Sequence, residues 1–178
     1  VLFRSLCDHA TGCAQAVRVS GASTVAAVNT TVMFSRQSDN WETPQQLFDA
    51  LDGEFGFDID AAASVQHHKI DNWFGPGSYL GEDGLLEPWL HATVWLNPPY
   101  SACRQFVAKA AEEAAKGCTV VMLLPARTCT RWFHDHIWQT EQHRPRPGVE
   151  VRFLKGRLKF GTSQNSAPFP SMVAVFRP

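Results

Sequence analysis

The stretch TVWLNPPY, residues 93–100, places a short apolar run directly before an asparagine and two prolines. Its first four residues are typical of a buried strand in a parallel sheet. Proline has no backbone N–H, so the two prolines end such a strand and hold the next residues stiffly beyond its carboxyl end. Ligands of open α/β sheets bind at that edge. Residues 93–100 therefore predict an α/β fold with a binding site that begins at Asn97.

The residues after this strand offer groups that suit an aromatic ring carrying an amino group. The side-chain oxygen of Asn97 and the backbone carbonyls of Asn97 and Pro98 accept hydrogen bonds, and Tyr100 presents an aromatic face for stacking. A strand followed by a Pro-Pro turn without any chemical role has the same appearance, so the motif alone leaves both interpretations open.

Composition limits the class of protein. The chain has 178 residues, 44% of them hydrophobic and 19% charged, which is typical of one globular domain. It contains no run of eighteen apolar residues that would span a membrane. The five cysteines form no C-x-x-C pair, and their odd number leaves a thiol unpaired within the chain. We expect a monomeric, cytoplasmic protein.

Charge is distributed unevenly along the chain, although the net charge is only −1. Residues 1–100 hold four Lys and Arg against twelve Asp and Glu, whereas residues 101–178 hold twelve against five. Such asymmetry is expected of a protein with one face toward a polyanion. Mutual neutralisation of the two halves in the folded protein explains it equally well.

The domain is expected to cover residues 33–178. Residues 1–32 show no sustained helical or strand period, and we expect them to be a disordered N-terminal extension. The domain then opens on WETPQQ, residues 41–46, where Thr43 and Pro44 fit the N-cap and first position of a helix. Thr43 is then explained by capping alone, while Trp41 either covers an adenine ring or fills the core.

Residues 55–63, FGFDIDAAA, predict a strand that ends on acidic and then small residues. Asp58 and Asp60 are candidates for the positive end of a cofactor, and Ala61 would let the cofactor approach the backbone; a solvated loop carboxylate is the plain alternative. No G-x-G-x-x-G motif is present, which argues against a dinucleotide. S-adenosylmethionine (SAM), which has no phosphates, fits better. Asp83 is a second acidic candidate, with Trp89 packed beneath it.

Histidine pairs suggest a metal site at first sight. His67 and His68 are adjacent, however, and adjacent side chains on an element point apart. His134 and His136 on an expected helix are no better placed, and we expect no metal.

Further elements follow the central motif. Ser101 fits the cap of a helix with a small apolar stripe, which ends at Gly117, and residues 119–124 form a second apolar strand. Strand, helix and strand of these lengths indicate a βαβ unit and hence a parallel sheet. Residues 149–154 and 171–176 predict two more strands, and residues 155–160 alternate basic with apolar side chains.

Basic and hydroxyl side chains lie where the second strand ends, on the same edge as the central motif. They suit phosphate contacts, and the alternating segment adds two cations that would share one face of a strand. The expected DNA-binding residues are Arg127, Thr128, Arg131, Arg157 and Lys159.

Over residues 35–178 the chain resembles the phage-type DNA N-6-adenine methyltransferases, a compact Dam-like family. The resemblance is carried, in order, by WETP, FDIDAAAS, EDGL, WLNPPYS, LLPARTCTRWFH, FLKGRLKF and APFPSM. One departure is Cys129, where the family pattern has an acidic residue.

The resemblance implies a Rossmann-like, SAM-dependent methyltransferase fold: a mostly parallel sheet of seven strands with helices on both faces and an antiparallel last strand. It implies that Asn97, Pro98, Pro99 and Tyr100 hold the target base. It also places Trp41, Thr43, Pro44, Asp58 and Asp60 in cofactor motifs.

The expected reaction is methyl transfer from SAM to the exocyclic N6 amine of adenine in double-stranded DNA after base flipping. The same Asn-Pro-Pro-Tyr motif also occurs in enzymes that methylate protein glutamine amides or RNA guanine. A non-catalytic DNA-binding relic of the fold is the third alternative.

Overall fold

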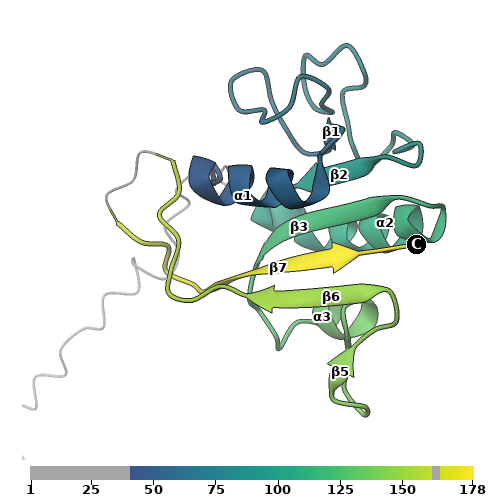
Figure 1. Ribbon diagram of the computed structural model, residues 1–178, viewed down its shortest axis with the longest axis vertical. Coiled ribbons are helices and arrows are strands. Elements are labelled where there is room, and N and C mark those ends of the chain that lie inside the picture. The colour runs from purple at the N-terminus through teal and green to yellow at the C-terminus, as the bar shows by residue number, and fades with distance from the viewer. Residues whose placement is uncertain (1–40, 162–164) are drawn as a thin grey trace, which may run out of the picture. The chain divides into compact units, whose positions relative to one another are not determined.

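The computed structural model describes residues 41–161 and 165–178 of a unit that spans Arg36–Pro178. The extension expected over residues 1–32 lies outside the described residues. Five strands form the main sheet, in the order β1-β2-β3-β7-β6 (Figure 1). Their bounds are Ile59–Asp60 for β1, Thr93–Leu96 for β2, Thr119–Pro125 for β3, Ser171–Phe176 for β7 and Val149–Phe153 for β6.

Strand direction follows the expected pattern on one side of the sheet. β1, β2 and β3 pair in parallel, whereas β7 is antiparallel to both β3 and β6. Because β7 runs opposite to both neighbours, β6 points the same way as β3. The expectation of an α/β fold with an antiparallel last strand is confirmed.

The expected sheet of seven strands is not what the described residues form. β4 (Trp138–Gln139) and β5 (Arg144–Pro145) pair only with each other, in a separate two-stranded ladder. Beyond β1, where further strands would extend the sheet, residues 61–92 form loops with two isolated bridges, Asp60 to Trp73 and Ser64 to His67. Glycine and proline recur in these loops and interrupt a regular ladder.

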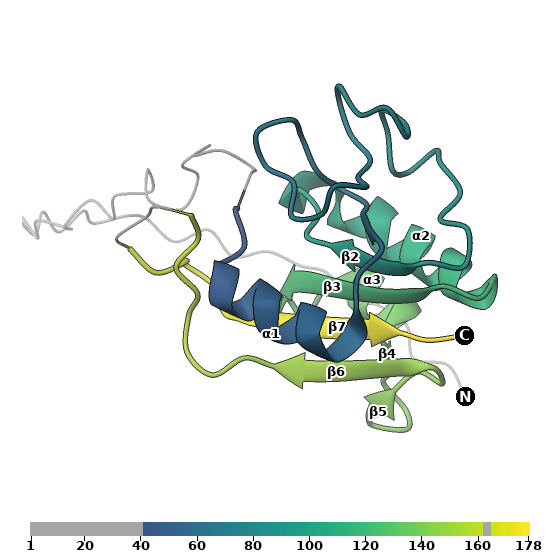
Figure 2. The ribbon, with the colours of Figure 1, turned by 45° about the horizontal axis from the view of Figure 1, so that its top comes forward.

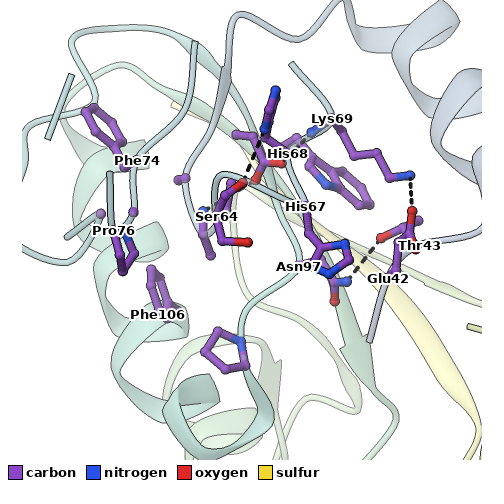
Figure 3. Close-up of a pocket in the computed structure, with 18 of the residues that line it drawn as sticks. Glu42, Thr43, Ser64, His67, His68, Lys69, Phe74, Pro76, Asn97 and Phe106 are labelled. Atoms are coloured by element: carbon purple, nitrogen blue, oxygen red, sulfur yellow. Dashed lines mark hydrogen bonds and ion pairs between the residues drawn. The ribbon is translucent and has the colours of Figure 1, made fainter. Parts of the chain in front are cut away.

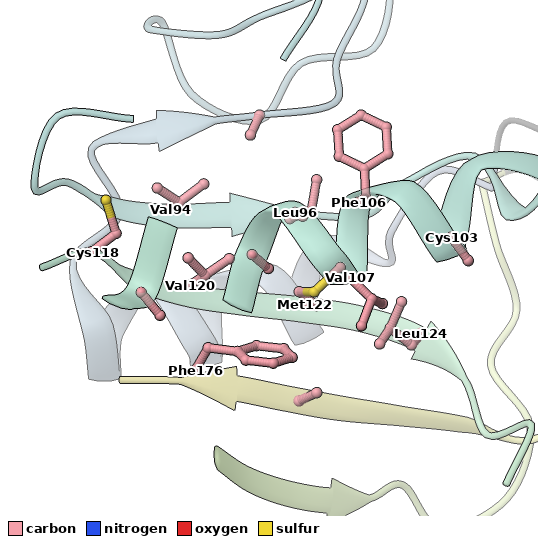
Figure 4. Close-up of a cluster of buried hydrophobic side chains, with 14 of the residues drawn as sticks. Val94, Leu96, Cys103, Phe106, Val107, Cys118, Val120, Met122, Leu124 and Phe176 are labelled. Atoms are coloured by element: carbon pink, nitrogen blue, oxygen red, sulfur yellow. The ribbon is translucent and has the colours of Figure 1, made fainter. Parts of the chain in front are cut away.

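Helices cover both faces of the sheet, as expected (Figure 2). α1 (Gln45–Phe55) packs on one face against the alternate residues Trp95, Val121, Leu123, Val173 and Val175. α2 (Cys103–Ala115) and α3 (Arg131–His136) pack on the other, against Val94, Leu96, Val120, Met122, Leu124, Met172, Ala174 and Phe176 (Figure 4). Successive strand residues thus serve opposite cores, so the strands are apolar throughout.

The N-terminal helix begins later than expected. α1 starts at Gln45, and its N-cap is Pro44, whose carbonyl accepts from Leu47 and Phe48 N–H. Thr43 makes no capping bond, because its hydroxyl accepts from Asn97 instead. The strand expected over residues 55–63 shrinks to the two residues of β1, because the chain up to Phe55 continues the helix.

Two further local expectations are corrected. Ser101 does not cap α2, because Tyr100–Ala102 form a 3₁₀ turn that leads into the helix. Residues 155–160 form an irregular segment rather than a strand. Their alternation nevertheless holds, since Arg157 and Lys159 are exposed while Phe160 is buried against α1.

Substitution of Met122 tests the hydrophobic core between the sheet and helices α2 and α3. It is fully buried in β3, between the parallel and antiparallel parts of the sheet. Met122→Ala should lower the free energy of unfolding by about 2–5 kcal/mol through lost burial and a residual cavity. Leu86→Ala is the control: this side chain is 80% exposed, and its loss should change stability by no more than about 0.5 kcal/mol. Urea unfolding would measure both, and equal effects would contradict the described core.

Candidate active site

A cavity of about 520 Å³ opens at the carboxyl ends of β1 and β2. Because these strands are parallel neighbours, with Asp60 beside Trp95, the chain leaves both at the same edge of the sheet. The wall is built from residues 41–43, the loop after β1, residues 82–84, and Asn97 and Pro99 after β2. Figure 3 shows Phe74, Pro76 and Phe106 on one side of the cavity and Glu42, Lys69 and Asn97 on the other.

Asp60 is the buried carboxylate of the cavity. It is 4% exposed, and its oxygens accept from the backbone N–H groups of Lys69 at 3.0 Å and Ala62 at 3.4 Å. Burial raises the pKa of Asp60 to about 6, although the two N–H donors and the nearby His68 and Lys69 act in the opposite direction. The loop after β1 therefore holds an acceptor that readily binds a proton.

Small residues form the part of the wall that follows β1. Ala61 is fully buried, lines the cavity and donates its N–H to the Trp95 carbonyl. A Cβ added at Gly84 would lie 2.0 Å from the Ala61 oxygen, and one added at Gly75 would lie 2.0 Å from the Ala63 oxygen. Only glycine fits at these two positions, so the loops pack tightly on the segment after β1.

The nitrogen and the oxygen of the Asn97 amide have different surroundings. Its nitrogen donates to the Trp41 carbonyl and, at 3.1 Å, to the Thr43 hydroxyl. Its oxygen is buried and has no hydrogen-bond partner among the described residues. A buried acceptor without a donor is costly unless a ligand supplies one. Asn97 lines the cavity, and its oxygen is the part of the amide that the described residues leave without a donor.

The rest of the central motif lies around this amide. No backbone N–H of the described residues donates to the Pro98 carbonyl, whereas the Pro99 carbonyl accepts from Ala102. The Tyr100 ring stacks on Trp41, with centroids 5.9 Å apart and 20° between the planes, and meets the edge of Phe169 at 5.0 Å. Burial raises the pKa of the Tyr100 hydroxyl above its usual range, so the hydroxyl is neutral.

Not every expected cofactor residue lines the cavity. Asp58 lies at the start of β1, away from the cavity, and accepts from the Thr93 N–H at 2.8 Å. Pro44 caps α1 and does not reach the wall. Trp41, Thr43, Asp60, Ala61 and Asp83 do line it. Asp83 also accepts from the Leu85 N–H, and Trp89 is fully buried beneath it as expected.

The cavity also has a basic side, which was not predicted from the sequence. Lys69 extends from the loop after β1 to the start of α1, with its nitrogen 3.0 Å from Gln45 Oε1 and 3.4 Å from Glu42 Oε1. His67 and His68 also line the wall. Lys69 is the one Lys or Arg between positions 37 and 100, and that isolation beside the expected cofactor strand was the available signal.

The five expected DNA contacts leave the sheet at the same edge as Asn97. Arg127, Thr128 and Arg131 follow β3, while Arg157 and Lys159 follow β6, which points the same way. All five side chains are exposed.

Residues 41–161 and 165–178 contain no cluster of three or more His, Cys, Asp or Glu side chains that could hold a metal ion. Within the same residues no helix has both the length and the apolar character needed to cross a membrane.

An α/β sheet with a cavity at the carboxyl ends of its parallel strands, lined by Asn97 and Pro99 of an Asn-Pro-Pro-Tyr motif, defines the class of amino-group methyltransferases. The chain belongs to the family DNA N-6-adenine-methyltransferase (Dam), whose model matches residues 30–178. The resemblance described from the sequence motifs is thereby confirmed, and membership of this family implies a bound methyl donor.

Two curated relatives carry the same name. A DNA N-6-adenine-methyltransferase of Escherichia phage T1 is 41% identical over 100 residues, which cover 54% of this chain and 40% of that protein. A DNA N-6-adenine-methyltransferase of Haemophilus phage HP1 is 29% identical over 143 residues, which cover 79% of each chain. The matched region thus spans less than half of the phage T1 protein and most of the phage HP1 protein.

Asp60 gives the site a measurable pH signature. Its pKa of about 6 in the folded protein exceeds the ordinary value, so between about pH 4 and 6 only the folded state holds this proton. Its stabilising contribution should fall as the pH rises through about 6. Between about pH 4.5 and 7, the wild type should lose roughly 2 kcal/mol relative to Asp60→Asn, since tenfold in proton affinity is about 1.4 kcal/mol. Urea unfolding at both pH values measures the difference; parallel pH profiles would contradict the burial of this carboxylate.

Proposed function

We propose that this chain transfers a methyl group from SAM to the N6 amine of adenine in double-stranded DNA. The observation that carries the proposal is the buried, unpartnered oxygen of Asn97 at the edge of the cavity. An exocyclic amine supplies the N–H donor that this oxygen lacks. The family and the names of both relatives support adenine as the ring that carries it.

The cavity suits SAM in size and charge. Its volume lies within the range of about 300–1,000 Å³ that is typical of small-molecule sites. Four carboxylates line it, from Glu42, Asp60, Glu82 and Asp83, and they favour a ligand that carries a sulfonium and an ammonium group. Phe74 and Phe106 provide apolar surface, and the small residues Ala61, Ala62 and Ala63 line the cavity beside them.

SAM, when bound, supplies an electrophilic methyl group. The chain's own contribution is to hold the amine in position. The Asn97 oxygen and the Pro98 carbonyl accept its two N–H bonds, which draws the nitrogen toward a tetrahedral, more nucleophilic form. The two Asn97 hydrogen bonds to Trp41 and Thr43 fix the direction of that oxygen before the substrate arrives. Positioning of this kind supplies most of the expected rate.

Access to the base requires flipping, which costs a few kcal/mol. Stacking on an aromatic side chain returns roughly 1–3 kcal/mol per base. Tyr100 is the expected partner, and Trp41, stacked on it, adds a second aromatic ring at the same place.

The distribution of paired and unpaired cations supports DNA as the partner. Lys109, Lys116, Arg152 and Arg177 each lie within 4 Å of a carboxylate. Among the described residues of the second half, Arg104, Arg127, Arg131, Arg144, Arg146, Lys155, Arg157 and Lys159 form no such ion pair. Four of them, Arg127, Arg131, Arg157 and Lys159, follow strands that end at the edge that carries Asn97, where phosphates flanking a flipped base would lie.

Asn97→Ala tests the proposed role of the amide. Loss of an acceptor aimed at the reacting amine should lower the rate of methyl transfer by about 10²–10³-fold. Thr43→Val is the matched variant, because it removes the hydroxyl that orients Asn97 but keeps the amide oxygen; its rate should fall less. Transfer of labelled methyl groups to DNA measures the rate, and calorimetry measures SAM affinity. Wild-type turnover by Asn97→Ala would refute the assignment.

Arg131→Ala tests the DNA-facing edge. Each neutralised phosphate contributes about −0.9 to the slope of log affinity against log salt, so this variant should flatten the slope by about one and weaken all sequences alike. Arg144→Ala is the control, since this exposed arginine lies on β5, away from the edge that carries Asn97 (Figure 1). Fluorescence anisotropy at several salt concentrations gives both slopes. A wild-type slope near zero would refute DNA as the substrate and favour a protein glutamine amide. Tighter binding of duplex DNA than of RNA, measured in the same way, would exclude RNA as the substrate.

A further inference from the structure

Helix α2 carries a buried carboxylate that the proposed reaction does not use. Glu113 is 2% exposed, and its carboxylate accepts from the ammonium groups of Lys109 at 2.8 Å and Lys116 at 3.0 Å. Both lysines bond Oε1, and the second oxygen, Oε2, accepts from the backbone N–H of Trp89 at 3.2 Å. Glu113 therefore joins α2 to the long connection between β1 and β2. Neither Glu113 nor Trp89 lines the cavity.

The network keeps Glu113 ionised. Burial acts to raise its pKa, but the hydrogen bonds from Lys109, Lys116 and Trp89 outweigh it and leave the pKa below its usual range. A buried carboxylate is tolerated only when it is paired and fully hydrogen-bonded in this way. Pairing with the two lysines does not require the hydrogen bond from the Trp89 N–H. That hydrogen bond therefore calls for a separate explanation.

Trp89 links Glu113 to Gly84, a residue of the cavity wall. Its ring is fully buried, Lys109 lies over it at 5.7 Å, and its indole N–H donates to the Gly84 carbonyl at 2.9 Å. Gly84 in turn packs so closely on Ala61 that a Cβ would lie 2.0 Å from the Ala61 oxygen. Gly84 and Ala61 both line the cavity.

We propose that Glu113 is a positioning residue for the cofactor site, which acts through Trp89 to hold residues 82–84 against the segment after β1. This inference rests on the proposed use of SAM and deepens it. The irregular loop that carries Asp83 has few regular backbone bonds of its own, with Leu86 and Glu87 N–H donating to the Asp83 carbonyl. Its position beside the cavity thus depends on the anchor at Trp89.

The chain offers a matched control next to Glu113. Glu112 also pairs with Lys116, but it is exposed and its carboxylate makes no contact with residue 89. Glu112→Gln and Glu113→Gln remove the same charge from the same helix. The lysines bond one oxygen of Glu113 and the Trp89 N–H bonds the other, whereas Gln has an NH2 group in place of one oxygen, so at one of the two positions a donor would face a donor. The two variants therefore differ in the anchor to Trp89.

Calorimetric titration of the full chain with SAM, at a temperature where thermal unfolding shows each variant to be folded, tests the proposal. Glu113→Gln should bind SAM roughly tenfold more weakly, equivalent to about 1.4 kcal/mol. Glu112→Gln should bind like the wild type, and DNA affinity should be unchanged in both. A purely structural role would lower the unfolding temperature of Glu113→Gln without changing SAM affinity.

The outcomes separate the inference from the proposed function. Equal SAM affinity of the two folded variants would overturn the role of Glu113 and leave the methyltransferase proposal intact. Failure of the wild type to bind SAM would refute the proposed function itself, and the inference with it. Should Glu113→Gln fail to fold, Trp89→Phe decides, because it keeps Glu113 and the backbone N–H that bonds it, while it removes the indole bond to Gly84 together with the larger ring beneath Lys109. Weaker SAM binding by Trp89→Phe supports the relay, and unchanged binding overturns it.

Discussion

Parallel pairing of β1 with β2, and of β2 with β3, is the constraint on which the site depends. Parallel strands all end at one edge, so segments distant in the sequence meet there: the acidic loop after β1, the Asn-Pro-Pro-Tyr turn after β2 and the basic loop after β3. The antiparallel β7 then returns the chain so that β6 again ends at this edge. The cavity and the cationic residues thereby lie at one edge of the sheet, although the segments that form them are far apart in the sequence.

At that edge of the sheet, the nitrogen and the oxygen of the Asn97 amide serve different purposes. The nitrogen is used by the protein, since it ties β2 to the segment before α1 through Trp41 and Thr43. The oxygen is left without a donor. An aspartate at this position would have no N–H to give, so its link to the Trp41 carbonyl would be lost. The same side chain thus orients itself and remains available to a substrate amine.

Charges are arranged by the same logic. Carboxylates line the cavity, where a cationic cofactor is proposed, and exposed cations, among them Arg127, Arg131, Arg157 and Lys159, follow β3 and β6. The carboxylate of Glu113 lies outside both groups, because two ammonium groups and one backbone N–H satisfy it beneath the loop that bears Asp83. Local pairing explains why a chain of net charge −1 can present both an acidic cavity and a basic edge.

The sequence by itself determined the class of fold, the strands at 93–96, 119–124 and 171–176, and the family, because apolar runs and the Asn-Pro-Pro-Tyr turn are local signals. It could not show that Thr43 serves Asn97 rather than the start of α1, because that choice depends on a residue 54 positions away. The different settings of Asp58 and Asp60 were likewise hidden, since only strand pairing places one at each end of β1. Tertiary structure alone decided these roles, because hydrogen bonds and burial act between residues that the chain order keeps apart.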